Sequence, residues 1–115
     1  MTEERARELL TRERRRIERS LAVATGEREA EDELSTVDQH PADYATELYD
    51  RELDESTAEH LRGELDAIDR AFKRLEEGTY GLSVESGKPI PDARLELIPW
   101  AERTAEEQTR FERVA

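Results

Sequence analysis

Apolar residues recur at helical spacing over two long segments of this chain, and this periodicity constrains the fold more than any other feature of the sequence. The first segment runs from Thr2 to Ala24 without a Gly or Pro. Thr2 can cap its start, and the carboxylates of Glu3 and Glu4 complement the helix macrodipole. The spacing of three, four or seven residues predicts an amphipathic helix over residues 2–24. Its apolar positions are Ala6, Leu10, Ile17, Leu21 and Ala24.

The second segment begins near Pro41 and ends at Glu77. Pro41 suits a first helical turn, where its missing N–H would be unpaired anyway, and Gly78 supplies a helix stop. Gly63 lies inside this helix, where either tight helix contact or an exposed position would explain it. A seam at steps of four and three contains Leu61, Leu65, Ile68, Phe72 and Leu75, and Ala45, Leu48 and Ala58 extend the same apolar face.

The stretch between these helices contains Gly26, an acidic run and few apolar residues, so it predicts a long connection. Two amphipathic helices joined by a loop most simply pack as an antiparallel hairpin. We therefore predict a mainly α protein in which residues 1–77 form a two-helix coiled-coil hairpin. Its helices are expected at about 2–24 and 41–77, with a tip loop at 25–43.

Most of the Gly and Pro residues lie after the second helix, and the helical pattern changes there. Residues 85–88 predict a turn between two short extended pieces, and Asp92 is predicted to cap a short helix that ends at Leu97. A last helix is expected over about residues 100–113. Residues 78–115 are therefore predicted to form a small α+β knob with a terminal helix. Its mini-core is expected to contain Tyr80, Leu82, Val84, Ile90, Leu95, Leu97, Ile98, Trp100 and Phe111.

The composition excludes several classes of function. The formal net charge is −12 and 42% of the residues are charged, so we expect no direct nucleic-acid binding, because phosphates are met by clustered Lys and Arg. A protein partner with a basic surface fits better. There is no Cys to form a disulfide or a thiolate metal site. Without a signal-peptide pattern or an apolar run of membrane-spanning length, a soluble cytoplasmic protein is expected.

Catalytic machinery is not indicated by the sequence. No carboxylate pair stands out as having opposed environments, no Gly-rich loop is placed to bind phosphate, and the serines lack a nucleophile-elbow pattern. His40 and His60 have no metal-ligand pattern around them. We predict a protein that is not an enzyme and has no cofactor.

The knob segment YGLSVESGKPIPDARLELIPWAERTAEEQ contains a motif with defined spacing. It resembles the zinc finger of the DksA/TraR family, in which an aromatic–Gly pair leads into Cys-x-x-Cys, then Gly-x-Pro-Ile, an Arg-Leu helix, a Pro, and a second Cys-x-x-Cys before Gln. The matching residues are Tyr80-Gly81, Gly87-Lys88-Pro89-Ile90-Pro91, Arg94-Leu95, Pro99 and Gln108. The four cysteine positions of that pattern are occupied by Ser83, Ser86, Thr104 and Glu107.

This replacement bears directly on metal binding. A structural zinc ion needs thiolate or imidazole ligands, and hydroxyls with one carboxylate are poor substitutes. We predict no zinc at this site, with Ser and Thr preserving the turn shape through local hydrogen bonds. A structural zinc site can stabilise a small finger by about 10 kcal/mol or more, so packing or docking onto the hairpin must offset its loss.

The tip loop carries a second resemblance to the same family, whose hairpin tip has an Asp-x-x-Asp-x-Ala arrangement. The matching stretch runs from His40 to Ala45, with Asp43 and Ala45 in register, His40 at the first Asp position, and Asp38 two residues earlier. The resemblance implies a transcription regulator whose acidic tip enters the secondary channel of RNA polymerase, with Asp38, His40, Asp43 and Ala45 as partner-binding residues. Asp43 has an alternative interpretation as a helix-start carboxylate.

Two alternatives remain open from the sequence. A non-enzymatic helical interaction protein would keep the family scaffold but pair with a different protein, and a carboxylate-based metal-binding protein would use the acidic side chains. The thin apolar seam is compatible with a monomer or a weak homodimer.

Overall fold

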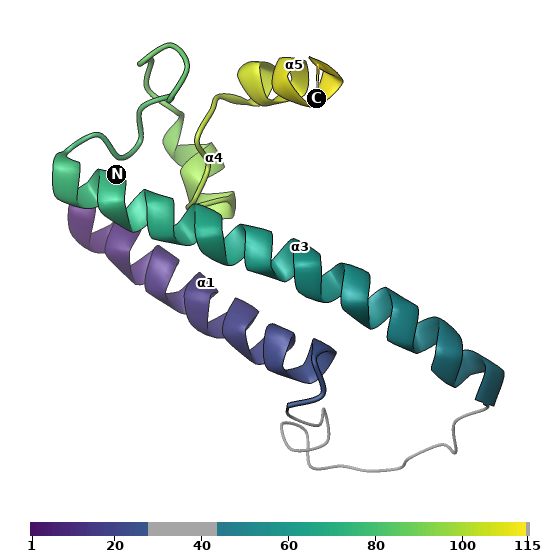
Figure 1. Ribbon diagram of the computed structural model, residues 1–115. Coiled ribbons are helices and arrows are strands. Elements are labelled where there is room, and N and C mark those ends of the chain that lie inside the picture. Colours follow the sequence, from purple (N-terminus) through teal and green to yellow (C-terminus); the bar gives the residue numbers. More distant parts are fainter. Residues whose placement is uncertain (28–43, 115) are drawn as a thin grey trace. The chain divides into compact units, whose positions relative to one another are not determined.

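The computed structural model describes residues 1–27 and 44–114, and it describes no side chains for residues 44–54. Its helices are α1 (Glu3–Ala24), α3 (Tyr44–Glu77), α4 (Asp92–Leu97) and α5 (Ala105–Val114). Figure 1 shows the two long helices α1 and α3 side by side, with the shorter helices following in the C-terminal part of the chain. The fold is mainly α, as predicted.

Local hydrogen bonds explain where the long helices begin and end. The N–H of Arg5 donates to Thr2 Oγ1 at 3.1 Å, which confirms Thr2 as the cap of α1. Gly26 has φ +79° and Gly78 has φ +79°. In both places an N–H of the following residue bonds back across the last turn, from Glu27 to the Ala22 carbonyl and from Thr79 to the Arg74 carbonyl, each at 2.9 Å. Both helices therefore stop in the same glycine-dependent motif.

The contacts of the chain cluster into two units. One unit comprises Met1–Arg14 with Asp66–Ala115, and the other comprises Arg15–Leu65. Each unit contains a part of α1 and a part of α3. The division at residue 77 that the sequence predicts between hairpin and knob stays a prediction.

The apolar face of the hairpin is buried largely as the periodicity predicts. Ala6, Leu10 and Ile17 of α1 are fully buried, and so is Ile68 of α3. Leu65 and Phe72 of the predicted seam are only half-buried. The sequence interpretation missed five further buried apolar positions, which are Leu9, Ala67 and Ala71 in the hairpin and Pro99 and Ala101 in the knob. Ala67 and Ala71 lie one and three residues from Ile68, so they widen the buried stripe at little cost in volume.

The apolar core of the knob contains fewer residues than the predicted mini-core. Ile90, Leu95 and Ala101 form this core, and Tyr80 and Ile98 pack against it. The Tyr80 hydroxyl donates to the Pro99 carbonyl at 2.8 Å, and burial raises the Tyr80 pKa to about 12. Within the described residues, extended pairing is limited to one antiparallel bridge between Leu82 and Pro89, so the knob contains no β-strand in that part of the chain.

Four residues assigned to the mini-core are exposed, so that part of the prediction is wrong. Leu97 is 79% exposed, because it follows buried Leu95 by two residues on a helix and points to the opposite side. The Phe111 ring lies beneath the Arg103 guanidinium at 3.8 Å and remains exposed on its other side. The remaining two are Leu82 and Val84.

Two predicted helix starts are also wrong. Pro91, not Asp92, is the N-cap of α4, and Asp92 instead accepts hydrogen bonds from the Met1 ammonium at 3.1 and 3.0 Å. The last helix begins at Ala105 instead of Trp100. A capping interaction at Thr104 sets that start, as described below.

Candidate functional site

The sequence predicted two sites, and the structure describes one of them. Asp38, His40 and Asp43 of the predicted tip lie outside the described residues. Ala45 lies in the first turn of α3, without a described side chain. The tip therefore stays a prediction. The four positions that correspond to zinc-ligand cysteines are all described.

Ser83 organises the first of the two turns that carry these positions. Its Oγ accepts hydrogen bonds from the N–H of Glu85 at 3.0 Å and of Ser86 at 3.2 Å. The Ser83 N–H donates to the Lys88 carbonyl at 2.8 Å, and the Gly87 N–H donates to the Ser83 carbonyl at 2.9 Å. Gly87 has φ +75°, a conformation that glycine adopts without steric cost. The side chain of Ser83 thus holds the turn with local hydrogen bonds, as the sequence suggested.

Thr104 and Glu107 form a reciprocal cap at the start of α5. The Thr104 N–H donates to Glu107 Oε1 at 2.9 Å, and the Glu107 N–H donates to Thr104 Oγ1 at 3.3 Å. This is the capping box of a Ser/Thr-x-x-Glu sequence, which satisfies two helix-end amides at once. It explains why α5 begins at Ala105. The sequence analysis treated both residues only as cysteine replacements and missed the capping signature.

Glu107 connects the two turns. Hydrogen bonds from the hydroxyls of Ser83 and Ser86, from the Thr104 N–H and from the Thr104 hydroxyl lower the pKa of its carboxylate to about 2, although desolvation opposes them. Glu107 and Ser83 are each only 5% exposed. The four degenerate positions therefore meet in one hydrogen-bonded cluster, which we call the Glu107 cluster (Ser83, Ser86, Thr104 and Glu107).

The donor set of the Glu107 cluster does not fit a zinc ion. It contains no thiolate or imidazole, and the single carboxylate is already engaged by donors from Ser83, Ser86 and Thr104. Among the described residues, no group of three or more His, Cys, Asp or Glu is arranged to hold a metal. The geometry of this cluster is that of a hydrogen-bonded junction.

Two arginines of α3 bind one knob carboxylate beside this junction. Arg70 Nε and Nη2 donate to the two oxygens of Glu102 at 2.9 and 3.1 Å, and Arg74 Nη1 donates to Glu102 Oε2 at 3.2 Å. Burial raises the pKa of Glu102, but the hydrogen bond from Arg70 and the nearby positive charges outweigh it, so this pKa lies below its usual range. The sequence offered no signal for these pairs, because their partners are far apart along the chain.

The other end of the knob is tied to α1. Arg5 Nε and Nη2 donate to the two carboxylate oxygens of Glu96 in α4 at 3.2 and 3.0 Å. The hydrogen bond from Arg5 lowers the Glu96 pKa. All of these residues belong to the same contact unit, so α1, α3 and the knob are joined there by bidentate ion pairs.

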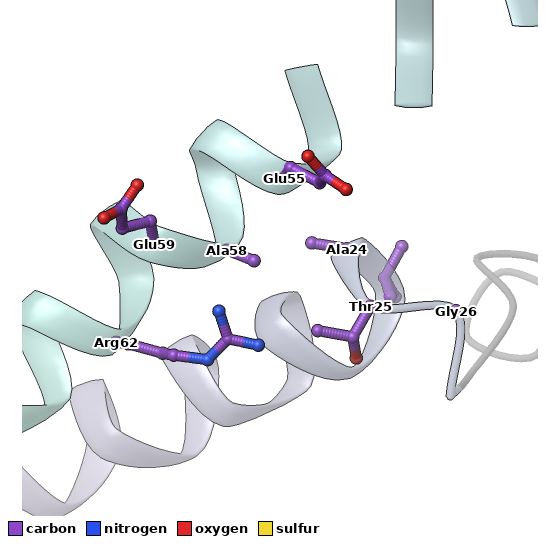
Figure 2. A pocket seen from close by; sticks show the side chains of 8 residues that line it. Ala24, Thr25, Gly26, Glu55, Ala58, Glu59 and Arg62 are labelled. Carbon is purple, nitrogen blue, oxygen red and sulfur yellow. The ribbon is translucent and has the colours of Figure 1, made fainter. Parts of the chain in front are cut away.

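The Arg15–Leu65 unit contains a groove that no predicted site residue lines. Its volume is about 850 Å³. Figure 2 shows the Arg62 side chain extending from α3 toward α1 across this groove. The lining residues are Val23, Ala24, Thr25, Gly26, Glu55, Ala58, Glu59 and Arg62.

Comparison with known proteins agrees with this architecture. Residues 78–113 match the family model for the prokaryotic dksA/traR C4-type zinc finger. The structure is similar to that of the transcription factor DksA2 from Pseudomonas aeruginosa, with a TM-score of 0.70 and 32% identity, covering 96% of this chain and 83% of that one. A hairpin of two long helices followed by a finger-shaped knob defines this class of protein. The chain belongs to the DksA/TraR family and lacks the four cysteines of its C4-type finger.

Two curated relatives match over shorter regions. An uncharacterized protein of Bacillus subtilis, YteA, is 50% identical over 74 residues, which is 64% of this chain and 31% of the relative. The RNA polymerase-binding transcription factor DksA of Caulobacter vibrioides is 43% identical over 72 residues, which is 63% of this chain and 51% of the relative. The chain thus spans between about a third and a half of the length of these relatives. None of the described helices is long and apolar enough to cross a membrane.

Proposed function

We propose that this chain is a transcription factor that binds RNA polymerase, and that it enters the secondary channel with the tip of its hairpin. The observation that carries this proposal is the similarity to a DksA2 transcription factor over 96% of the chain. The Caulobacter vibrioides relative, which is named for polymerase binding, supports the choice of partner.

The charge of the chain is compatible with this partner. A net charge of −12 attracts a protein toward basic surfaces and raises the rate of encounter with them. The proposed contact residues are Asp38, His40, Asp43 and Ala45. Asp43 is the carboxylate that we assign to activity, because it occupies the matching Asp position of the family tip motif, whereas His40 replaces the other Asp.

The ion pairs that join the knob to α1 and α3 support a positioning role for the knob. Glu102 is held by both Arg70 and Arg74, and Glu96 is held by Arg5. Such bidentate contacts restrict rotation more than a single bond would. We propose that the knob sets the angle at which the protein docks on polymerase.

A binding titration with the core RNA polymerase of the host tests the proposal. Saturable binding that is displaced by a known secondary-channel competitor is expected. The Asp43→Asn variant should still bind but fail to alter transcription, while Asp66→Asn, which changes an exposed aspartate of α3, should act like the unchanged protein.

Absence of binding at micromolar concentrations would contradict the proposed function. The chain would then be a helical interaction protein with a different partner. Sedimentation over a range of concentrations addresses that outcome, since pairing through the Leu61 and Ile68 seam would give a mass that rises with concentration. Both residues are buried within the single chain, which argues against a shared seam.

A further inference from the structure

We propose that the Glu107 carboxylate closes the knob in place of a metal ion, by gathering donors from the other three positions at which a four-cysteine finger has its ligands. This inference concerns the folding of the knob and does not depend on polymerase binding. It rests on the hydrogen bonds, burial and charge of the Glu107 cluster.

The polarity of the junction is the reverse of that in a zinc site. A zinc finger places a cation at the centre and surrounds it with anionic thiolates. Here one ligand position supplies the anion, and the hydroxyls of Ser83, Ser86 and Thr104 and the Thr104 N–H donate to it. An ionised carboxylate accepts up to about four hydrogen bonds, so these donors can satisfy it. Attraction between the two turns is therefore retained without a cation.

Ser83 is chemically suited to this role. A hydroxyl can accept two hydrogen bonds and donate one. Ser83 accepts from the N–H groups of Glu85 and Ser86 at 3.0 and 3.2 Å, and its hydroxyl is the largest cause of the lowered Glu107 pKa. An alanine at this position would leave two turn amides and one buried carboxylate without these partners. Ser83 thus connects the Glu107 carboxylate to the backbone amides of the turn.

Burial makes these bonds necessary. An ionised carboxylate that is removed from water is strongly destabilising unless donors or a cation compensate it. Glu107 is 5% exposed, and its hydrogen-bonding groups are all neutral. The nearby cation Arg103 is engaged elsewhere, since its Nε donates to Glu85 Oε2 at 3.0 Å. The neutral donors of the cluster therefore carry the compensation.

The cluster also joins parts of the knob that are distant along the chain. It connects the turn of residues 83–88 with the start of α5. A backbone bond from the Val84 N–H to the Glu102 carbonyl at 2.9 Å lies between the same two segments. The small apolar core of Ile90, Leu95 and Ala101 does not include residues of α5, so removal of Glu107 is expected to loosen both the turn and the first turn of that helix.

Hydrogen exchange of the full-length chain tests this proposal, because it reports each turn separately. In Glu107→Ala, the amides of Ser86 and Thr104 should exchange roughly tenfold faster or more, while the amide of Leu10 in α1 should not change. Glu106→Ala is the matched control, since Glu106 is the exposed neighbour in the same helical turn. Treatment of the unchanged protein with EDTA should leave exchange and thermal unfolding as they were.

A double variant distinguishes a cluster from independent contacts. Ser83→Ala combined with Glu107→Ala should speed exchange at Ser86 by much less than the product of the two single effects, because both changes remove the same bond. Equal effects of Glu106→Ala and Glu107→Ala would overturn the proposal, and so would a loss of order on adding EDTA. Should Glu107→Ala unfold the knob, Glu107→Gln keeps the shape without the charge, and exchange at the unchanged rate in that variant would also overturn it.

Discussion

The hairpin and the knob are each stabilised by a different kind of interaction. In the hairpin, Leu10, Ile17 and Ile68 are fully buried. In the knob, the apolar core is small, and the Glu107 cluster and the Glu102 ion pairs supply the remaining contacts. The comparison teaches that periodic burial can be interpreted from sequence, whereas a polar junction depends on residues that only the fold brings together.

Introducing the four cysteines would replace the hydrogen bonds of the Glu107 cluster with a metal site. The combined changes Ser83→Cys, Ser86→Cys, Thr104→Cys and Glu107→Cys should create a site for one zinc ion, because the four positions already meet. Zinc binding in such fingers is worth about 10 kcal/mol or more. Metal analysis and EDTA-sensitive thermal unfolding measure it. A variant with only three of these cysteines is the control, and failure of the full set to take up zinc would show that the four positions do not form a tetrahedral site.

Truncation of the hairpin core should have the next largest effect. Ile68→Ala removes methyl groups from a fully buried position, and the cavity should lower the free energy of unfolding by about 2–5 kcal/mol. Urea denaturation measures this change. Leu97→Ala in the exposed part of α4 should stay within about 0.5 kcal/mol of the unchanged protein. Similar losses in the two variants would contradict the assignment of the core to the hairpin seam.

Removal of the Glu102 charge should be less destabilising. Glu102→Gln weakens the bonds to Arg70 and Arg74 and leaves the buried Arg74 guanidinium poorly compensated. A loss of about 1.5–3 kcal/mol is expected. Glu85→Gln, which affects a more exposed pair with Arg103, should cost less than about 1 kcal/mol. Urea denaturation measures both losses. If Glu85→Gln were the more destabilising change, the Glu85–Arg103 pair, and not the Glu102 pairs, would be the main stabilising ion pair of the knob.

Acid should weaken the knob through Glu107. Its pKa is lowered from 4.5 to about 2 in the folded chain, so its contribution to stability is complete above pH 4.5 and is lost as the pH falls toward 2. Thermal unfolding of the unchanged protein and of Glu107→Gln should therefore differ most near neutral pH and converge at about pH 2. A constant difference across this range would show that ionisation of Glu107 is not what stabilises the knob.

The smallest predicted effect lies on the hairpin side. Gly63 has no heavy atom within 4 Å of the position that a Cβ would occupy, so an exposed site, and not tight helix contact, accounts for it. Gly63→Ala should raise the free energy of unfolding by about 0.5–1 kcal/mol through helix propensity. Denaturant unfolding checks this, and Gly78→Ala is the contrast, because its φ of +79° makes any side chain unfavourable. Stabilisation by both changes would contradict the assigned helix end.

Much of the fold was predictable from the sequence for physical reasons that differ between regions. The Thr2 cap and the helix ends at Gly26 and Gly78 are local, so composition and spacing reveal them. The Arg70–Glu102 pair joins residues 32 positions apart, and no local pattern predicts it. The exposed position of Leu97 was missed because every apolar residue of the knob was assigned to the core, regardless of the side of the short helix on which it lies.

The candidate site was likewise predictable from the sequence only in its local features. The positions of Ser83, Ser86, Thr104 and Glu107 were identified from the spacing of the family motif, and the structure brings them together. Their mutual bonding was only partly anticipated. Thr104-x-x-Glu107 is a capping box that is readable in the sequence, whereas the bonds from the two serines to Glu107 require the folded arrangement.

The hydrogen bonds of the Glu107 cluster imply a distinctive response to mutation. A zinc centre binds its ion through all its ligands together, so the loss of one cysteine endangers the whole site. The Glu107 cluster consists of separate bonds to Ser83, Ser86 and Thr104, and single changes at the donors remove them one at a time. The stability of such a knob should fall in steps as random substitutions accumulate. Substitution should be tolerated best at Ser86, the most exposed residue among Ser83, Ser86 and Thr104.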